Sequence, residues 1–195
     1  MASPARVRKT PSNQVRIIGG QWRSRIVRFP EAPGLRPTPD RVRETLFNWL
    51  GQRLDGLECV DLFAGSGALG FEALSRGAGR VVMVEAGREA VAALRLSAQA
   101  LGADRAVVVA GDALAWLKRD KGRFDIAFVD PPYASALQAQ VLQALPASLK
   151  PGARVYCESA EPVAPGDGPW RVLKEGRAGA VRFALLAFEP AGAAG

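Results

Sequence analysis

The 195-residue sequence contains no histidine and only two cysteines, and each shortage excludes some catalytic mechanisms or structural sites. Without histidine, Ser-His-Asp and Cys-His nucleophiles, an imidazole base and most zinc sites are excluded. Cys59 and Cys157 are too few for a disulfide framework and lie in apolar segments, so we expect buried thiols. No run approaches the roughly 18 apolar residues of a membrane helix, and the chain does not open on an apolar signal segment. We therefore expect a cytoplasmic protein with no membrane and no metal partner.

The excess of positive over negative charge lies in about the first quarter of the chain. Residues 1–53 carry 11 Lys/Arg against 3 Asp/Glu, whereas residues 54–195 carry 15 against 16. A basic segment on a near-neutral body indicates a polyanionic partner, most simply nucleic acid; a solvated basic tail is the alternative. The arginines that we select as candidates for this contact are Arg16, Arg23, Arg25, Arg28, Arg36 and Arg41.

The basic part of the chain has its own pattern. Residues 1–14 are polar and basic, so we expect a disordered tail. Residues 15–29 predict a short β-hairpin, followed by a loop rich in proline and glycine over 30–37. Thr38-Pro39-Asp40 then predicts a helix start with Thr38 as its cap. In this helix Val42, Leu46, Trp49 and Leu50 share an inward face, and Arg43 points elsewhere.

After residue 53, strands and helices alternate. The patterns predict strands over 57–63, 80–84, 106–110, 124–129 and 154–158, with helices ending near 76 and spanning 88–100, 113–119 and 135–149. Such alternation implies a doubly wound α/β fold with a mostly parallel sheet. The last two strands, over 170–174 and 181–188, flank a glycine-containing turn and predict an antiparallel hairpin. With 48% hydrophobic residues, the chain can bury a real core.

A glycine-rich turn marks a candidate nucleotide site. Gly65, Gly67 and Gly70 form G-x-G-x-x-G between a strand and a helix, where backbone N–H groups can face a ligand. Glu85 ends the next strand, 20 residues after Gly65, where a carboxylate can accept bonds from ribose hydroxyls. A NAD-binding fold shares these features, and a tight turn without a ligand is a further alternative.

Two other carboxylates refine this site. Asp61 lies at the strand end just before the turn and suits a cationic group, such as the ammonium of a methionine moiety. Asp112 ends the third strand, where it can reach an adenine amino group or cap the helix that follows.

Asp130-Pro131-Pro132-Tyr133 follows the strand that we expect beside the first strand, across the switch point of the sheet. A carboxylate and a carbonyl freed by the two prolines can accept both hydrogens of an exocyclic amino group. Tyr133 offers a ring on which a base can stack. This arrangement suits methyl transfer to an amino nitrogen by positioning alone.

These motifs resemble those of a known family. Asp61-Leu-Phe-Ala-Gly-Ser-Gly67 and Asp130-Pro-Pro-Tyr133 are similar to motifs of class I S-adenosylmethionine-dependent amino methyltransferases. The segments 16–23 (RIIGGQWR), 35–50 (LRPTPDRVRETLFNWL) and 67–76 (GALGFEALSR) resemble the RsmD-like family, which methylates guanine N2 in 16S ribosomal RNA. The resemblance spans about Val15 to Phe188, but Ser24 and Gly87 stand where the family usually has Gly and Asp.

The resemblance implies a Rossmann-like methyltransferase domain over 53–190, an RNA-binding hairpin, loop and helix over 15–52, and a tail over 1–14. The partner would be 16S rRNA or the small ribosomal subunit, and we expect a monomer. The cofactor would be S-adenosyl-L-methionine, and Asp130 to Tyr133 would hold the target base. The implied cofactor residues are Asp61, Phe63, Ala64, Gly65, Ser66, Gly67, Glu85, Asp112 and Ala113.

Four alternatives belong to other classes. A glutamine-side-chain methyltransferase favours Asn-Pro-Pro-Tyr and a helical substrate domain, and neither occurs here. A DNA amino methyltransferase needs a target-recognition region for which the chain has no room. A non-catalytic RNA-binding module has no use for Asp130 and Tyr133 in one crevice. An NAD oxidoreductase would need a hydride-site base, and none is evident.

Overall fold

The computed structural model describes residues 13–30, 37–119, 122–132, 135–160 and 168–190. Its main sheet has seven strands in the order β5-β4-β3-β6-β7-β9-β8. All the pairings from β5 to β7 are parallel, and β9 is antiparallel to both of its neighbours. The strands are β3 (Glu58–Asp61), β4 (Arg80–Glu85), β5 (Ala106–Ala110), β6 (Phe124–Val129), β7 (Leu149–Ser159), β8 (Trp170–Ala178) and β9 (Val181–Phe188).

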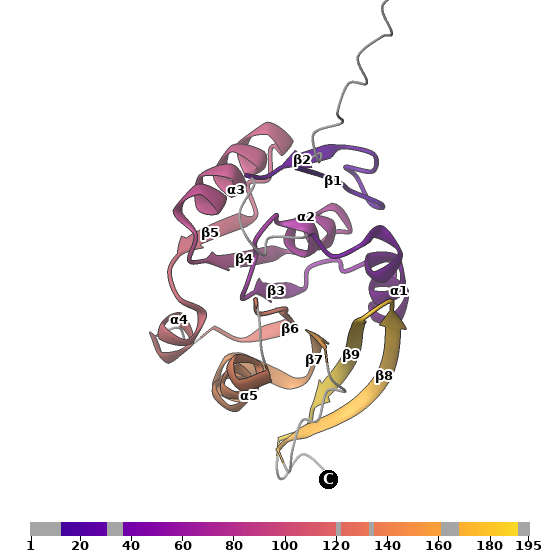
Figure 1. Ribbon diagram of the computed structural model, residues 1–195, viewed down its shortest axis with the longest axis vertical. Coiled ribbons are helices and arrows are strands. Elements are labelled where there is room, and N and C mark those ends of the chain that lie inside the picture. Colours follow the sequence, from indigo (N-terminus) through magenta and orange to yellow (C-terminus); the bar gives the residue numbers. More distant parts are fainter. Residues whose placement is uncertain (1–12, 31–36, 120–121, 133–134, 161–167, 191–195) are drawn as a thin grey trace, which may run out of the picture.

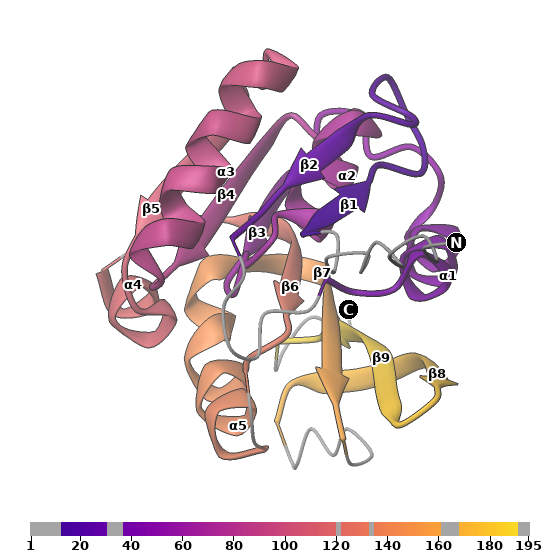
Figure 2. The ribbon, with the colours of Figure 1, turned by 45° about the horizontal axis from the view of Figure 1, so that its top comes forward.

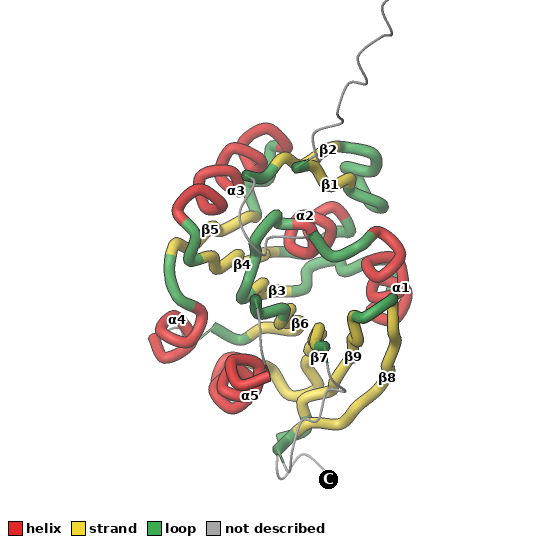
Figure 3. Tube along the Cα trace, viewed as in Figure 1, coloured by secondary structure: helices red, strands yellow, loops and turns green. Residues whose placement is uncertain are grey.

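Helices cover both faces of this sheet (Figures 1 and 3). One face packs against α1 (Asp40–Leu50), α2 (Ala68–Ser75) and α3 (Arg88–Leu101), and this core includes Leu46, Phe71 and Leu94. The other face packs against α4 (Ala113–Arg119) and α5 (Ser135–Ala144) through a second core that includes Leu117 and Val141. These two cores confirm the predicted doubly wound α/β fold with its antiparallel C-terminal hairpin.

Several predicted boundaries were wrong. The helix predicted over 135–149 ends at Ala144 and tightens into a 3₁₀ helix, η1 (Leu145–Ser148). Pro146 lacks an N–H group and cannot continue an α-helix hydrogen-bond ladder. β7 and β8 are longer than the predicted 154–158 and 170–174, because their ladders add register pairs that the local sequence pattern does not reveal, such as Arg177 with Arg182. β9 has the predicted bounds. By contrast, the first strand of the sheet is only Glu58–Asp61.

The predicted N-terminal hairpin is confirmed as β1 (Gln14–Arg16) paired with β2 (Ile26–Arg28). Figure 2 shows it lying across α2, and Val15, Ile17, Trp22 and Val27 bury their side chains in the core that α2 also lines. Gly20 is required here, because its φ is +76° and a Cβ atom would lie 1.9 Å from the carbonyl oxygen of Ser75. Ser24 has a φ of +69°, so the serine that replaces the family's usual glycine occupies a left-handed position. The tail over residues 1–12 and the loop residues 31–36 lie outside the described residues.

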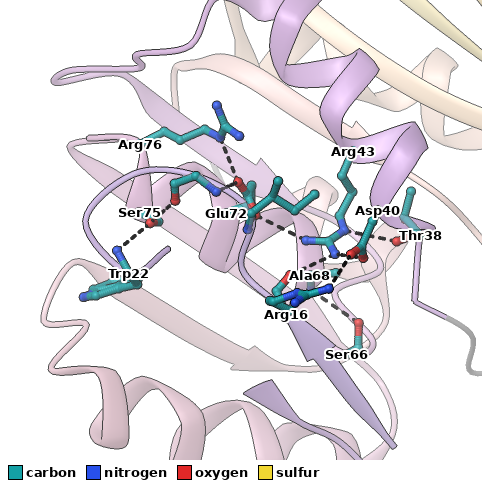
Figure 4. Close-up of polar contacts among 12 residues, drawn as sticks. Arg16, Trp22, Thr38, Asp40, Arg43, Ser66, Ala68, Glu72, Ser75 and Arg76 are labelled. Atoms are coloured by element: carbon teal, nitrogen blue, oxygen red, sulfur yellow. Dashed lines mark hydrogen bonds and ion pairs between the residues drawn. The ribbon is translucent and has the colours of Figure 1, made fainter. Parts of the chain in front are cut away.

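A buried ionic cluster fastens the hairpin and α1 to α2 (Figure 4). We call Glu72, Arg43 and Arg76 the Glu72 cluster. The Glu72 carboxylate is fully buried and accepts four hydrogen bonds: from the backbone N–H groups of Ile18 and Gly19 at 2.8 Å each, from Arg43 Nη1 at 3.2 Å and from Arg76 Nε at 2.8 Å. The turn of the hairpin and α1 are therefore both bound to one carboxylate of α2.

The cluster corrects two predictions about α1. Arg43 does not point away from the core; it is fully buried and also donates to the carbonyl oxygens of Arg16 and Thr38. Thr38 does not cap the helix, because the N-cap is Pro39, whose carbonyl oxygen accepts from Val42 and Arg43. The burial of Arg43 could not be read from helix periodicity, because its partners Glu72 and Arg16 lie 29 and 27 positions away in the sequence.

Within the ranges given above, no helix combines the length and the apolar character that crossing a bilayer requires.

We predict that Glu72→Gln lowers the free energy of unfolding by about 3–5 kcal/mol, because it removes the buried carboxylate that two buried guanidinium groups share and leaves Arg43 only the half-exposed Asp40 as a counter-charge. Urea denaturation measures this loss. The matched control is Glu58→Gln, which removes an exposed carboxylate 3.5 Å from Arg80 and should cost at most about 1 kcal/mol. Equal losses for the two variants would contradict the role assigned to the cluster.

Candidate active site

A cleft of about 1040 Å³ opens at the carboxyl ends of the parallel strands. Acidic residues at these strand ends face it: Asp61 on β3, Glu85 on β4, Asp112 after β5, Asp130 after β6 and Glu158 on β7. Ligands of open α/β sheets bind at this edge, next to the switch point where β3 lies between β4 and β6. The remaining predicted cofactor residues on its wall are Phe63, Ala64, Gly65, Ser66 and Ala113.

The glycine-rich turn forms one wall of the cleft. The Gly65 N–H group donates to Glu85 Oε2 at 2.8 Å, so the turn is tied to the end of β4. Gly67 does not line the cleft; it closes the turn with a φ of +77°, and a Cβ atom there would lie 2.5 Å from the Phe71 ring. Gly67 therefore fixes the shape of the turn, and its predicted contact with the cofactor stays a prediction.

Asp61 is 3% exposed, and its carboxylate accepts hydrogen bonds from the backbone N–H groups of Phe63 and Gly70. Burial, with a smaller contribution from the charge of Glu85, raises the pKa of Asp61 to about 7. Among the described residues, its partners are backbone groups and no cationic side chain forms an ion pair with it. A cationic group of a ligand would lower the free-energy cost of burying the charged Asp61 carboxylate. The ammonium group of S-adenosylmethionine fits this requirement.

Glu85 and Asp112 have structural contacts as well as places on the cleft wall. The second carboxylate oxygen of Glu85 accepts from the Gly87 N–H group at 2.6 Å. A Cβ atom at Gly87 would lie 3.0 Å from that oxygen, so a side chain there would crowd the acidic end of β4. Asp112 Oδ1 accepts from the Ala115 N–H group at 2.8 Å and so caps α4. Both interpretations of Asp112, helix cap and cleft residue, are therefore compatible with its position.

Asp130, Pro131 and Pro132 line the opposite wall. Burial raises the pKa of Asp130 to about 8, and the negative charges of Glu158 and then Asp61 add to this effect. Tyr133, predicted as a stacking platform, lies outside the described residues.

Sequence reasoning missed two polar residues of this wall. Glu158 lies beside Asp130 because β6 and β7 are parallel and pair Val129 with Cys157. Thr38 enters from the segment before α1 and hydrogen-bonds to Glu158 through its hydroxyl. A signal for Glu158 was present, because it ends a predicted apolar strand as Asp130 does.

The candidate RNA-binding arginines lie on the N-terminal extension. Arg23, Arg28 and Arg41 are exposed, and Arg16 is exposed beside Asp40, with 3.9 Å between the charged atoms. Arg25 is partly engaged, because its guanidinium donates to the Ala100 carbonyl oxygen at 3.1 Å. Arg36 lies outside the described residues.

The fold and the cleft define a Rossmann-like S-adenosylmethionine-dependent methyltransferase. The profile of the family described as Conserved hypothetical protein 95 matches residues 15–187, and the chain belongs to this family. This confirms the resemblance to the RsmD-like family that the motifs indicated.

Two curated relatives named Ribosomal RNA small subunit methyltransferase D support the assignment. The protein from Escherichia coli strain K12 is 42% identical over 187 residues, covering 93% of each chain. That from Haemophilus influenzae strain Rd is 40% identical, covering 91% of this chain and 96% of the relative.

Solved structures agree with the fold. The putative methyltransferase yhhF from Escherichia coli superposes with a TM-score of 0.82 at 39% identity, covering 90% of this chain and 98% of the other. An RNA methyltransferase from Salinibacter ruber in complex with S-adenosyl-L-homocysteine has a TM-score of 0.64 at 18% identity, covering 79% of this chain and 94% of the other. The second similarity shows the fold alone.

For the residues that the structure describes, no group of three or more His, Cys, Asp or Glu side chains is arranged to hold a metal ion.

We predict that Asp130→Asn stabilises the ligand-free protein at pH 8 much more than at pH 4.5. The folded Asp130 carboxyl keeps its proton up to a pKa of about 8, whereas an unfolded aspartate loses it near 4, so wild-type stability falls as pH rises between these values. The upper limit is about 1.4 kcal/mol per pH unit, and each kcal/mol shifts the melting temperature by about 2–4 °C. Thermal denaturation across this pH range measures the effect.

The control for this series is Asp104→Asn, which changes an exposed aspartate far from the cleft wall. Its difference from the wild type should not vary with pH. A constant difference for Asp130→Asn as well would show that Asp130 is solvated in the folded protein.

Proposed function

We propose that this chain transfers a methyl group from S-adenosyl-L-methionine to the exocyclic N2 amino group of a guanine in small-subunit (16S) ribosomal RNA. The observation that carries the proposal is the pairing of Asp61 and Asp130 across one cleft, at the ends of the adjacent strands β3 and β6. The relatives' names give the substrate class. We further propose that the protein acts as a monomer, because both walls of the cleft come from one chain. We also propose that it acts in the cytoplasm.

We assign the cofactor to the wall built by β3, β4 and β5. Asp61 would hold the ammonium, Glu85 the ribose hydroxyls and Asp112 the adenine amino group, with Phe63, Ala64, Gly65, Ser66 and Ala113 forming the surface between them. The bound cofactor supplies a methyl group activated by a sulfonium. Because the Gly65 N–H group donates to the Glu85 carboxylate, the glycine-rich turn and this ribose-binding carboxylate would keep a fixed position relative to each other.

We assign the target base to the wall that Asp130 begins. The Asp130 carboxylate and a neighbouring carbonyl would accept the two amino hydrogens and direct the nitrogen lone pair along the transfer axis. The cationic cofactor beside Asp130 would lower the pKa of this carboxyl group from about 8 and so favour the carboxylate, which can take the proton that the nitrogen loses on methylation. No imidazole is needed, which agrees with a chain without histidine. Tyr133 would stack on the base.

We assign the RNA backbone to the N-terminal extension, residues 15–52. A smaller hollow lies between β1, β2 and the start of α1, and it shares Pro37 and Thr38 with the main cleft. The exposed arginines of the extension therefore lie on the element that also contributes to the cleft wall. This continuity favours a strand of RNA that runs from the hairpin toward Asp130.

The test separates the two walls. We predict that Asp130→Ala abolishes methyl transfer while S-adenosylmethionine affinity stays close to that of the wild type. Glu85→Ala should instead weaken cofactor binding by about 1.5–3 kcal/mol, as expected when a hydrogen bond to a charged group is lost. Calorimetry gives the affinities, and mass spectrometry of RNA, protein and DNA incubated with labelled cofactor identifies the modified atom.

Label on a glutamine side chain or a DNA base would contradict the proposed acceptor. Loss of cofactor binding in Asp130→Ala would contradict the division of the cleft into two walls.

We predict that Arg23→Gln with Arg28→Gln flattens the slope of log K against log salt for RNA binding by about 1.4 units, if both side chains contact phosphates. The control, Arg95→Gln with Arg119→Gln, removes the same charge from exposed positions on α3 and α4 and should leave the slope unchanged. Cofactor affinity should not change in either pair. An unaltered slope in the hairpin pair would mean that these arginines form only a solvated face.

A further inference from the structure

Glu158 is a second acidic group on the base-binding wall of the cleft. It occupies the tenth position of β7, and the parallel register that pairs Val129 with Cys157 places it beside Asp130. Both residues line the cleft, and the two side chains are close enough for the negative charge of Glu158 to raise the pKa of Asp130. The wall therefore presents two hydrogen-bond acceptors side by side.

Three donors hold Glu158 in place. The hydroxyl of Tyr156, two residues earlier on the same strand face, donates to Glu158 Oε1 at 2.8 Å. The hydroxyl of Thr38 bonds to the same carboxylate, and Gln138 on α5 donates to the Glu158 backbone carbonyl at 2.8 Å. Tyr156 is itself fully buried and packs against Phe183, so its hydroxyl has a fixed position. The carboxylate is a preorganised acceptor supported from three elements.

Two neighbouring buried carboxylates repel each other and are costly unless donors or cations face them. Burial raises the pKa of both groups, and the hydrogen bonds from Tyr156 and Thr38 partly offset this for Glu158. Among the described residues, the other ionisable groups that interact with the pair are Asp61, Tyr156 and Cys157, and none of them supplies a positive charge. The pair thus favours a ligand that presents several N–H donors along one edge.

Among the bases that carry an exocyclic amino group, guanine alone presents a ring N–H next to that group. Adenine and cytosine present an unprotonated ring nitrogen at the same place, which would face the lone pairs of a carboxylate. We propose that Glu158 accepts the N1–H group of the guanine whose N2 amino group Asp130 holds, and so makes the site selective for guanine. This inference rests on the proposed function and assigns Glu158 as its specificity-determining residue.

The experiment uses two synthetic RNAs that span the guanine identified by mass spectrometry. One carries guanine at that position, and the other carries 2-aminopurine, which keeps the amino group but lacks the N1 hydrogen. The wild type should prefer guanine by roughly 10–100-fold in kcat/KM, the range expected for a hydrogen bond to a charged group. Equal rates for the two RNAs would overturn the inference without any variant being made.

Glu158→Gln supplies the second arm, because an amide can donate to the unprotonated N1 of 2-aminopurine. The preference for guanine should vanish or reverse, while affinity for S-adenosylhomocysteine stays unchanged. Tyr156→Phe, which removes one donor to the carboxylate, should reduce the preference partially. Glu175→Gln, an exposed glutamate on β8, is the matched control and should keep the wild-type ratio.

A fall in both rates with an unchanged ratio in Glu158→Gln would show that Glu158 only supports the fold of the wall, and would overturn the inference. This result is distinct from failure of the proposed function, in which the wild type would methylate no guanine at all.

Discussion

The fully buried carboxylate of Glu72 is the contact on which the arrangement of this protein depends. It lies on α2, the helix that follows the glycine-rich turn, and it binds the hairpin through two backbone N–H groups and α1 through Arg43. Arg76 completes the charge balance and is covered by the Phe47 ring, 4.7 Å from its guanidinium carbon. Because a buried charge is stable only with its partners in place, the extension and the sheet are fixed relative to each other.

This attachment has a consequence for the cleft. The same Arg43 that pairs with Glu72 also holds the carbonyl oxygen of Thr38, whose hydroxyl bonds to Glu158. A chain of contacts thus runs from the helix of the glycine-rich turn, through α1, to the wall beside Asp130. The basic extension therefore contributes to the wall of the cleft as well as carrying the exposed arginines.

The cleft gathers acidic residues at the carboxyl ends of the parallel strands. Asp61 and Asp130 both have pKa values raised by burial, to about 7 and about 8, and Glu158 shifts in the same direction. These carboxyl groups lower the stability of the fold progressively as the pH rises from about 4 to their raised pKa values, unless a ligand matches their charge. A sulfonium cofactor that carries an ammonium group, together with a base edge rich in N–H donors, is a ligand pair that provides this match.

The sequence by itself determined the fold class, the order of the elements and the acidic strand ends, because alternation of strands and helices and the position of a residue after a strand are local properties. It also indicated the family, because the motifs that contain Asp61, Gly65 and Asp130 are short contiguous segments that can be recognised without a structure. Only the tertiary structure decided that Arg43 is buried, that Thr38 faces the cleft and that Glu158 lies beside Asp130. Each of these depends on contacts between residues at least 27 positions apart or in different elements, such as Arg43 with Glu72, and on the register of β6 against β7. Hydrophobic periodicity shows which residues share one face of a helix or strand. Which other element packs against that face is decided only by the tertiary structure.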